Sequence, residues 1–106
     1  MKIRLNAGKG MLTGKQKRFL QALGTELDPI FQIGKGGLND NLFRQLDDAL
    51  EARELIKVKV LSNSEENPRE AANTISQVVG CEVVQVVGKN MIFYKRSEKK
   101  PKIELP

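Results

Sequence analysis

Histidine and tryptophan are absent from this sequence, and Cys81 is its only cysteine. A single cysteine cannot form an intrachain disulfide, and a chain without histidine has neither imidazole acid–base chemistry nor the commonest zinc ligand. Carboxylates remain, but no pattern marks a substrate pocket for them. We therefore expect no enzyme activity, no metal site and no cofactor, and we expect Cys81 to be a small buried hydrophobe.

Long apolar runs are also absent. None of the stretches that would indicate a transmembrane helix or a secretory signal is present in the 106 residues, so we expect a cytoplasmic protein without a membrane partner. The length suits one domain. We assign residues 11–96 to this domain, residues 1–10 to a disordered leader or native arm, and residues 97–106 to a mobile basic tail.

Acidic residues are fewer than basic ones, which gives the chain a net charge of +5. Most of the excess lies in the first ten residues and after residue 94, so the body between them is nearly neutral. Lys15, Lys17, Arg18 and Lys35 nevertheless give the first third a basic character. An anionic partner is indicated by the position of these charges more than by their sum.

Hydrophobic periodicity and capping residues predict an α/β fold. In order, the pattern predicts a helix from Thr13, a strand at "IFQI", a helix from Asn39 or Asp40, a strand at "LIKVKVL", a helix from Asn67, and a hairpin from "EVVQVV" to "MIFYK". This α-β-α-β-α-β-β order favours a compact domain with a four-stranded mixed sheet, in which only the hairpin requires antiparallel pairing.

All three predicted helices have apolar faces that we expect to be buried, and the face of the second helix consists of Leu42, Leu46, Ala49 and Leu50. The expected core residues of the first and third helices are Phe19, Leu20, Leu23, Leu27, Ala71, Ala72, Ile75, Val78 and Val79.

The stretch "FQIGKGGLND" places three glycines around Lys35, between the first strand and the second helix. Gly34, Gly36 and Gly37 can let successive N–H groups converge on an anion at a helix start, or they can simply form a tight turn. A Walker loop would require Ser or Thr after a Gly-Lys pair, and a dinucleotide fingerprint would require a small residue where Asn39 stands. What remains is a Gly-x-x-Gly loop, the arrangement that clamps a nucleic-acid backbone in KH domains.

The quoted loop belongs to a longer pattern. "MLTGKQKRFLQAL", "DPIFQIGKGGLNDNLFRQLDDALEARELIKVKVL" and "EVVQVVGKNMIFYK" resemble the bacterial single-domain members of the CRM family, the YhbY-like proteins. The resemblance implies an RNA-binding domain similar in fold to the C-terminal domain of translation initiation factor 3. It further implies that Gly34, Lys35, Gly36 and Gly37 contact RNA, and that the partner is large-subunit ribosomal RNA or its precursor particle.

Other basic residues are weaker candidates. Lys15, Lys17 and Arg18 could contact phosphates or could form a solvated helix face. Arg44 could reach RNA from the start of the second helix, but Arg44 and Arg53 could also pair with carboxylates of that helix.

We therefore predict a non-catalytic RNA-binding protein that assists assembly of the large ribosomal subunit and takes no small-molecule substrate. The alternative is a protein-interaction module that docks on a ribosomal protein or assembly factor through helix surfaces, most readily the acidic second helix.

Overall fold

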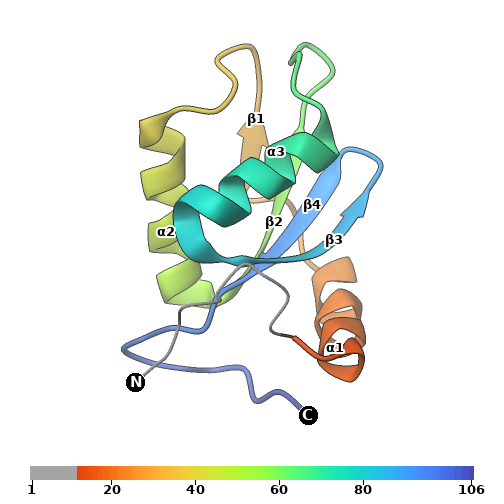
Figure 1. The fold of residues 1–106 in the computed structure, drawn as a ribbon, viewed down its shortest axis with the longest axis vertical. Helices are drawn as coiled ribbons and strands as arrows, with labels where there is room; N and C mark the ends of the chain where they lie inside the picture. Colours follow the sequence, from red (N-terminus) through yellow and green to blue (C-terminus); the bar gives the residue numbers. More distant parts are fainter. Residues whose placement is uncertain (1–11) are drawn as a thin grey trace.

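A computed structural model describes residues 12–106 as three layers, with a four-stranded sheet between helices on both faces (Figure 1). The elements are α1 (Gly14–Thr25), β1 (Phe31–Ile33), α2 (Asp40–Arg53), β2 (Leu55–Val60), α3 (Pro68–Ile75), a π-helical turn η1 (Ser76–Gly80), β3 (Glu82–Val87) and β4 (Asn90–Tyr94). The strand order is β1-β2-β4-β3. β1 pairs parallel with β2, whereas β4 runs antiparallel to both of its neighbours, so the predicted α/β fold with a mixed sheet is confirmed.

The helix starts follow from the capping residues. The Thr13 hydroxyl accepts the Gln16 N–H at 3.1 Å, and the Gln16 amide oxygen accepts the Thr13 N–H at 3.0 Å, which completes a capping box. Asn39 Oδ1 accepts the N–H of Leu42 at 2.8 Å. Asn67 caps α3, whose first residue, Pro68, has no N–H that would need a partner.

The larger core lies between the sheet and the pair α2 and α3. Alternate residues of β2 and β4 point to this side, including Val58 and Phe93, and they meet Leu46 of α2 and Ile75 of α3. Cys81 is buried in the same core, and burial raises the pKa of its thiol to about 12. The thiol is therefore protonated at neutral pH, in agreement with the expected structural role.

The opposite face of the sheet is covered by α1. Gly24 lies so close to the sheet that a β-carbon on it would be 2.7 Å from Ile92 Cδ1, and Leu20 is fully buried beside it. Since contact is made through Leu20 and Gly24, Phe19 and Leu23 lie on the flank and are 38% and 40% exposed. The prediction that all apolar residues of this helix are buried is therefore wrong for these two.

The end of the third helix also departs from the expected pattern. After Ile75 the chain adopts the π-helical turn η1, which ends at Gly80 with a φ of +78°. A π turn contains more residues than an α turn and so changes the phase of the apolar face. Val78 is consequently 57% exposed, although the α-helical period predicts that it is buried.

The C-terminal segment (residues 97–106) packs against the domain, although we expected it to be a mobile tail. It crosses the end of the molecule below α2 and α1 (Figure 1). Ile103 and Leu105 pack with the cluster beneath α1, and Gln16 Nε2 donates to the carbonyl oxygen of Pro106 at 3.2 Å.

Two carboxylates near the C-terminal end of α2 hold this segment. Glu54 is fully buried, and its carboxylate accepts the N–H groups of Ser97 at 2.8 Å and of Lys102 and Ile103 at 2.7 Å. One turn earlier, the Glu51 carboxylate accepts the Ser97 hydroxyl at 2.6 Å, together with two more backbone N–H groups of the segment.

These hydrogen bonds determine the protonation of both carboxyls. Burial alone would raise the pKa of Glu54, but the N–H groups of Ser97, Ile103 and Lys102 hold that pKa below its ordinary value. The Ser97 hydroxyl and the backbone N–H groups of Glu98 and Lys99 lower the pKa of Glu51. Both side chains therefore accept hydrogen bonds as charged carboxylates at neutral pH.

No helix within residues 12–106 is long and apolar enough to cross a bilayer.

Acid should weaken this attachment. Because the folded-state pKa values of Glu51 and Glu54 are lowered, their stabilisation is complete above the unfolded carboxyl pKa of about 4.3 and is lost as the pH falls through the lowered values. We expect Glu54→Gln to lower the free energy of unfolding at pH 7 by about 1–3 kcal/mol and to flatten the fall below pH ~4. Urea unfolding between pH 2 and 7 measures both effects.

Glu104→Gln is the matched control, because Glu104 is exposed. Equal pH dependence of the Glu54→Gln and Glu104→Gln variants would contradict the role of the buried carboxylate.

Candidate nucleic-acid interface

The loop between β1 and α2 begins with a four-residue turn, Gly34 to Gly37. The N–H of Gly37 donates to the carbonyl oxygen of Gly34 at 3.1 Å, and Lys35 and Gly36 occupy the two corners. Both corner residues are exposed. The turn delivers the chain to Asn39 at the N-terminus of α2, where unpaired N–H groups and the positive end of the helix dipole favour anions.

The three glycines of this turn differ in whether the backbone requires glycine at their position. Gly37 has a φ of +64°, the left-handed conformation in which side chains other than glycine are strained. Gly34 and Gly36 lie outside that conformation. A β-carbon on Gly36 would meet no atom within 4 Å, and one on Gly34 would make only ordinary contacts, the nearest at 3.7 Å. The tight turn thus requires glycine at position 37, but it does not require glycine at positions 34 and 36.

One side of the loop faces a carboxylate. A β-carbon on Gly37 would lie 2.8 Å from Glu66 Oε2, and one on Gly34 would lie 3.8 Å from Asn63 Oδ1. Both neighbours belong to the loop between β2 and α3, which rises beside the glycine loop (Figure 1). A negative charge at Glu66 repels a phosphate on that side. An anion is therefore better accommodated at the exposed corner and on the side of α2.

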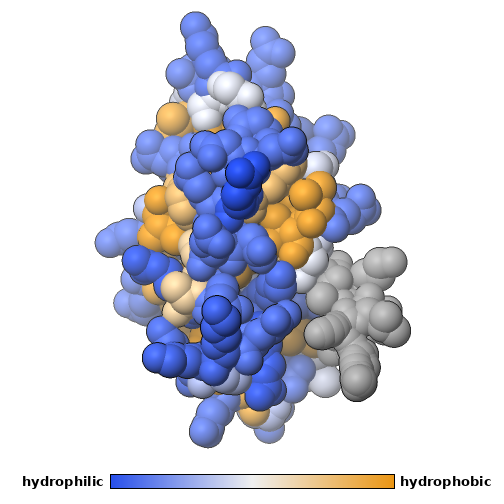
Figure 2. All heavy atoms as spheres, turned by 90° about the vertical axis from the view of Figure 1, so that its left-hand side faces the viewer, coloured by the Kyte–Doolittle hydropathy of each residue, from blue (hydrophilic) through white to orange (hydrophobic). Residues whose placement is uncertain are grey.

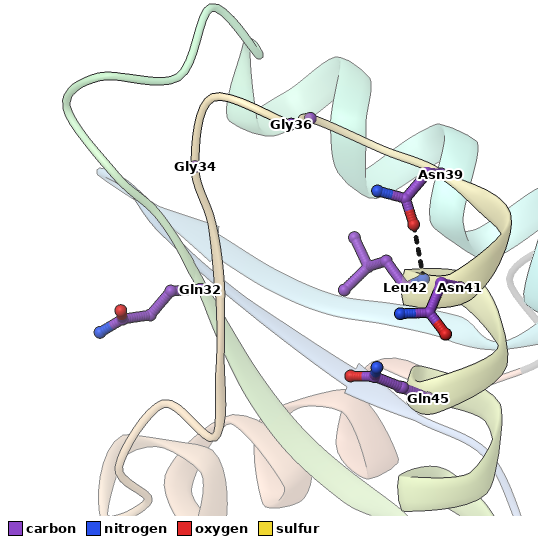
Figure 3. Close-up of a pocket in the computed structure, with 8 residues that line it drawn as sticks. Gln32, Gly34, Gly36, Asn39, Asn41, Leu42 and Gln45 are labelled. Carbon is purple, nitrogen blue, oxygen red and sulfur yellow. Dashed lines mark hydrogen bonds between the residues drawn. The ribbon is translucent and has the colours of Figure 1, made fainter.

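On the side of α2, the loop borders an open hollow of about 250 Å³. Its lining consists of loop backbone, amide side chains and one leucine: Gln32, Gly34, Gly36, Gly37, Asn39, Asn41, Leu42 and Gln45. Figure 3 shows the side chains of Asn41 and Gln45 one above the other on α2, directed toward β1 and the loop. The Asn39 side chain is engaged in capping Leu42.

The amides of this hollow are candidate site residues that the sequence analysis did not identify. Asn41 and Gln45 are four positions apart and both are exposed, which puts them on one face of α2 beside the glycine loop. Amide side chains can donate to phosphate oxygens and can hydrogen-bond base edges. The i, i+4 spacing directly after the loop is the signal that could have identified them.

The basic residues predicted to bind RNA do not lie together. Lys35 is at the tip of the glycine loop, at one end of the molecule, whereas α1 lies toward the opposite end (Figure 1). Lys15, Lys17 and Arg18 occupy the first turns of α1, so they are not neighbours of the loop. Arg44 is exposed on α2, three residues after Asn41, and is the candidate closest to the hollow along that helix.

Some of the charged residues have structural partners instead. Lys57 Nζ donates to the Thr25 carbonyl oxygen at 3.5 Å near the end of α1, and Lys95 forms an ion pair with Asp47 at 2.9 Å. Across residues 12–106, no ion pair joins Arg44 or Arg53 to a carboxylate, so the expected pairing within the second helix is absent there. In the same range, no cluster of three or more potential ligands could hold a metal ion.

Comparison with protein families agrees with this architecture. The family model of the CRS1/YhbY (CRM) domain matches residues 12–95. The chain belongs to the CRM family. This membership confirms the resemblance seen in the sequence, and it identifies the chain as a CRM-domain protein and not an enzyme.

Individual relatives give the same result. The chain is similar to "Probable RNA-binding protein YqeI" of Bacillus subtilis, with 51% identity over 91% of this chain and 100% of the relative. It is 36% identical to an "RNA-binding protein" of Haemophilus influenzae, over 90% of this chain and 95% of the relative. The solution structure of SAV1595 from Staphylococcus aureus superposes with a TM-score of 0.76 at 53% identity, over 91% of this chain and 100% of that one.

The different roles of the glycines predict different tolerances to alanine. We expect Gly37→Ala to lower the free energy of unfolding by about 1–2 kcal/mol, because alanine is strained in the left-handed conformation. Gly36→Ala, with open space around its β-carbon, should change it by less than about 0.5 kcal/mol. Urea unfolding of both variants measures the difference, and equal losses would show that the described turn geometry is wrong.

Proposed function

We propose that this CRM-domain protein binds RNA through the backbone and Lys35 of the glycine loop, with the amide-lined hollow beside it, and that it assists assembly of the large ribosomal subunit. The observation that carries the proposal is that the loop contains more glycines than its turn geometry requires. The turn requires glycine only at position 37, yet positions 34 and 36 also lack side chains. Their absence leaves the loop backbone open to close approach by a ligand.

The chemistry of the loop suits a phosphodiester. Gly36 offers an exposed backbone corner, Lys35 adds a mobile positive charge, and the N-terminus of α2 adds the positive end of a helix dipole. Such contacts give affinity without reading sequence. Asn41 and Gln45 are placed to hydrogen-bond a nucleotide whose phosphate rests on the loop, and Leu42 offers an apolar contact for a base.

The family supports RNA as the ligand. Two relatives that align over nearly the whole chain carry names that describe RNA-binding proteins. The resemblance to YhbY-like proteins points further, to ribosomal RNA of the large subunit or its precursor particle, and that activity would take place in the cytoplasm.

The alternative of a protein-docking surface on the acidic second helix has less support. Asp47 is occupied by Lys95, and Glu51 and Glu54 hold the C-terminal segment. Figure 2 shows the side of the molecule on which α2 lies: hydrophilic residues dominate it, and hydrophobic areas are confined to patches beside a central polar band. This side lacks the broad apolar centre that is typical of stable protein interfaces.

Variants of the glycine loop test RNA binding directly. We expect Lys35→Glu to weaken binding of structured RNA about tenfold or more and to lower the salt slope by about 1, because a phosphate contact is replaced by repulsion. Gly37→Asp should weaken binding further, since it adds a negative charge beside the loop. Fluorescence titrations at several salt concentrations provide both quantities.

Two control variants separate charge at the loop from other effects. Gly37→Asn has nearly the shape of Gly37→Asp without its charge, and both side chains meet the same backbone strain at position 37, so Gly37→Asn should retain more affinity. Lys89→Glu makes the same charge change as Lys35→Glu in the exposed β3–β4 turn. If Lys35→Glu and Lys89→Glu weaken binding equally, or neither does, the loop is not the binding site.

A further inference from the structure

Basic residues from two parts of the described chain lie toward the end of the molecule opposite the glycine loop (Figure 1). The first turns of α1 contribute Lys15, Lys17 and Arg18. The chain after β4 contributes Arg96, Lys99 and Lys100, all of them exposed. The hydrogen bond from Gln16 to Pro106 joins the end of the C-terminal segment to α1.

The C-terminal segment is held in a way that leaves its basic side chains exposed. Glu51 and Glu54 bind it through backbone N–H groups and one hydroxyl, and not through ammonium groups. Of its lysines, Lys102 donates its Nζ to the Ala52 carbonyl oxygen at 2.7 Å, whereas Lys99 and Lys100 use only their backbone N–H groups. The buried carboxylates thus fix the position of the segment without pairing with the Lys100 side chain.

Opposing charges around this surface are fewer than the basic ones. Glu98 and Glu104 are exposed within the segment. Glu54 is fully buried, and Arg96 lies near enough to contribute to the lowered pKa of its carboxyl. Glu51 lies near Lys99, whose charge likewise contributes to the lowered pKa of Glu51. The exposed charge that remains is positive, and it lies at fixed positions on a packed backbone.

We propose that Arg96, Lys99 and Lys100 form a second phosphate-binding surface at the C-terminal end of α2, and that a single RNA spans this surface and the glycine loop. The proposal rests on the proposed function, since it assumes that the partner is RNA. Both surfaces adjoin α2: the loop precedes its first residue, and Glu51 and Glu54 lie at its last turn. A helix of 14 residues is about 21 Å long, so α2 sets a fixed spacing between the two surfaces.

RNA fits this arrangement better than an acidic protein does. A phosphodiester chain carries regularly spaced negative charges over any length, so one molecule can reach two basic surfaces separated by the length of α2. The body between the surfaces presents the mainly hydrophilic face seen in Figure 2, which suits a polyanion crossing it more than an apolar protein interface.

Two RNA probes and one triple variant of the full chain test the proposal. The short probe is a single strand of about four nucleotides, the length clamped by a Gly-x-x-Gly loop. The long probe is a hairpin of about 30 nucleotides, long enough to reach both surfaces. In the variant, Arg96→Gln, Lys99→Gln and Lys100→Gln are combined, which removes three charges and keeps every backbone N–H that Glu51 and Glu54 accept.

We expect the triple variant to bind the hairpin about tenfold more weakly, with a salt slope reduced by about 2, and to bind the short strand like the unmodified protein. Unchanged affinity and salt slope for the hairpin would overturn the proposal. Lys35→Glu tests the glycine loop separately, because this substitution should weaken binding of both probes. If the triple variant binds the hairpin more weakly and Lys35→Glu binds it with unchanged affinity, the second surface is supported and the glycine-loop proposal is contradicted.

A second variant tests whether the position of the segment matters. Glu54→Gln weakens the attachment while raising the net charge by one. If the fixed position matters, hairpin binding should weaken despite the added positive charge. Stronger binding would show that the segment acts only as a flexible cation and would overturn the proposal of a fixed surface. The triple variant could instead bind RNA normally and lose a protein complex that resists nuclease. That result would show that the partner of this surface is a protein, and it would overturn the proposal.

Discussion

The buried carboxylate of Glu54 is the interaction on which the lower half of this molecule depends. Glu54 ends α2 with a φ of +68°, and β2 begins at the next residue. Its backbone carbonyl accepts the Lys95 N–H at 2.9 Å just after β4, and its side chain binds three N–H groups of the C-terminal segment. One residue therefore connects a helix, two strands and the end of the chain, and a non-glycine residue in this conformation persists only where its surroundings enforce it.

The two proposed binding regions lie at opposite ends of α2. Its N-terminus receives the glycine loop and forms one wall of the amide-lined hollow, whereas its C-terminus holds the C-terminal segment. Both junctions are positioned by the same helix, whose buried face packs through Leu46 and Leu50 on the sheet. An RNA that contacts both regions would meet a nearly rigid spacing, so less conformational entropy would be lost on binding than with a mobile tail.

Local chemistry made much of the fold predictable. Each helix start carries a complete capping signal within a few residues: Thr13 with Gln16, Asn39, and Asn67 with Pro68. All three signals form caps in the structure. The position of the glycine loop between a strand and a helix is similarly local. By contrast, the exposure of Phe19 and Leu23 depends on which side of α1 meets Ile92, a contact that helical periodicity does not specify.

The attachment of the C-terminal segment was not predictable for a related reason. Its donors are backbone N–H groups, which every residue except proline has, and their acceptors are 43 to 49 residues away. A lysine-rich stretch therefore has the composition of a mobile tail even when distant carboxylates fix its backbone. The separation of Lys15, Lys17 and Arg18 from the glycine loop is likewise a matter of topology, since it follows from the end of the sheet against which α1 packs.

The central claim is that the protein contacts large-subunit ribosomal RNA through the glycine loop. Ultraviolet crosslinking in cells, followed by sequencing of the attached RNA, tests it most directly when the unmodified protein is compared with Lys35→Glu. The account predicts crosslinks concentrated in large-subunit ribosomal RNA and a clear loss of yield in the variant. Crosslinks scattered over messenger RNAs, or an undiminished yield from Lys35→Glu, would contradict it.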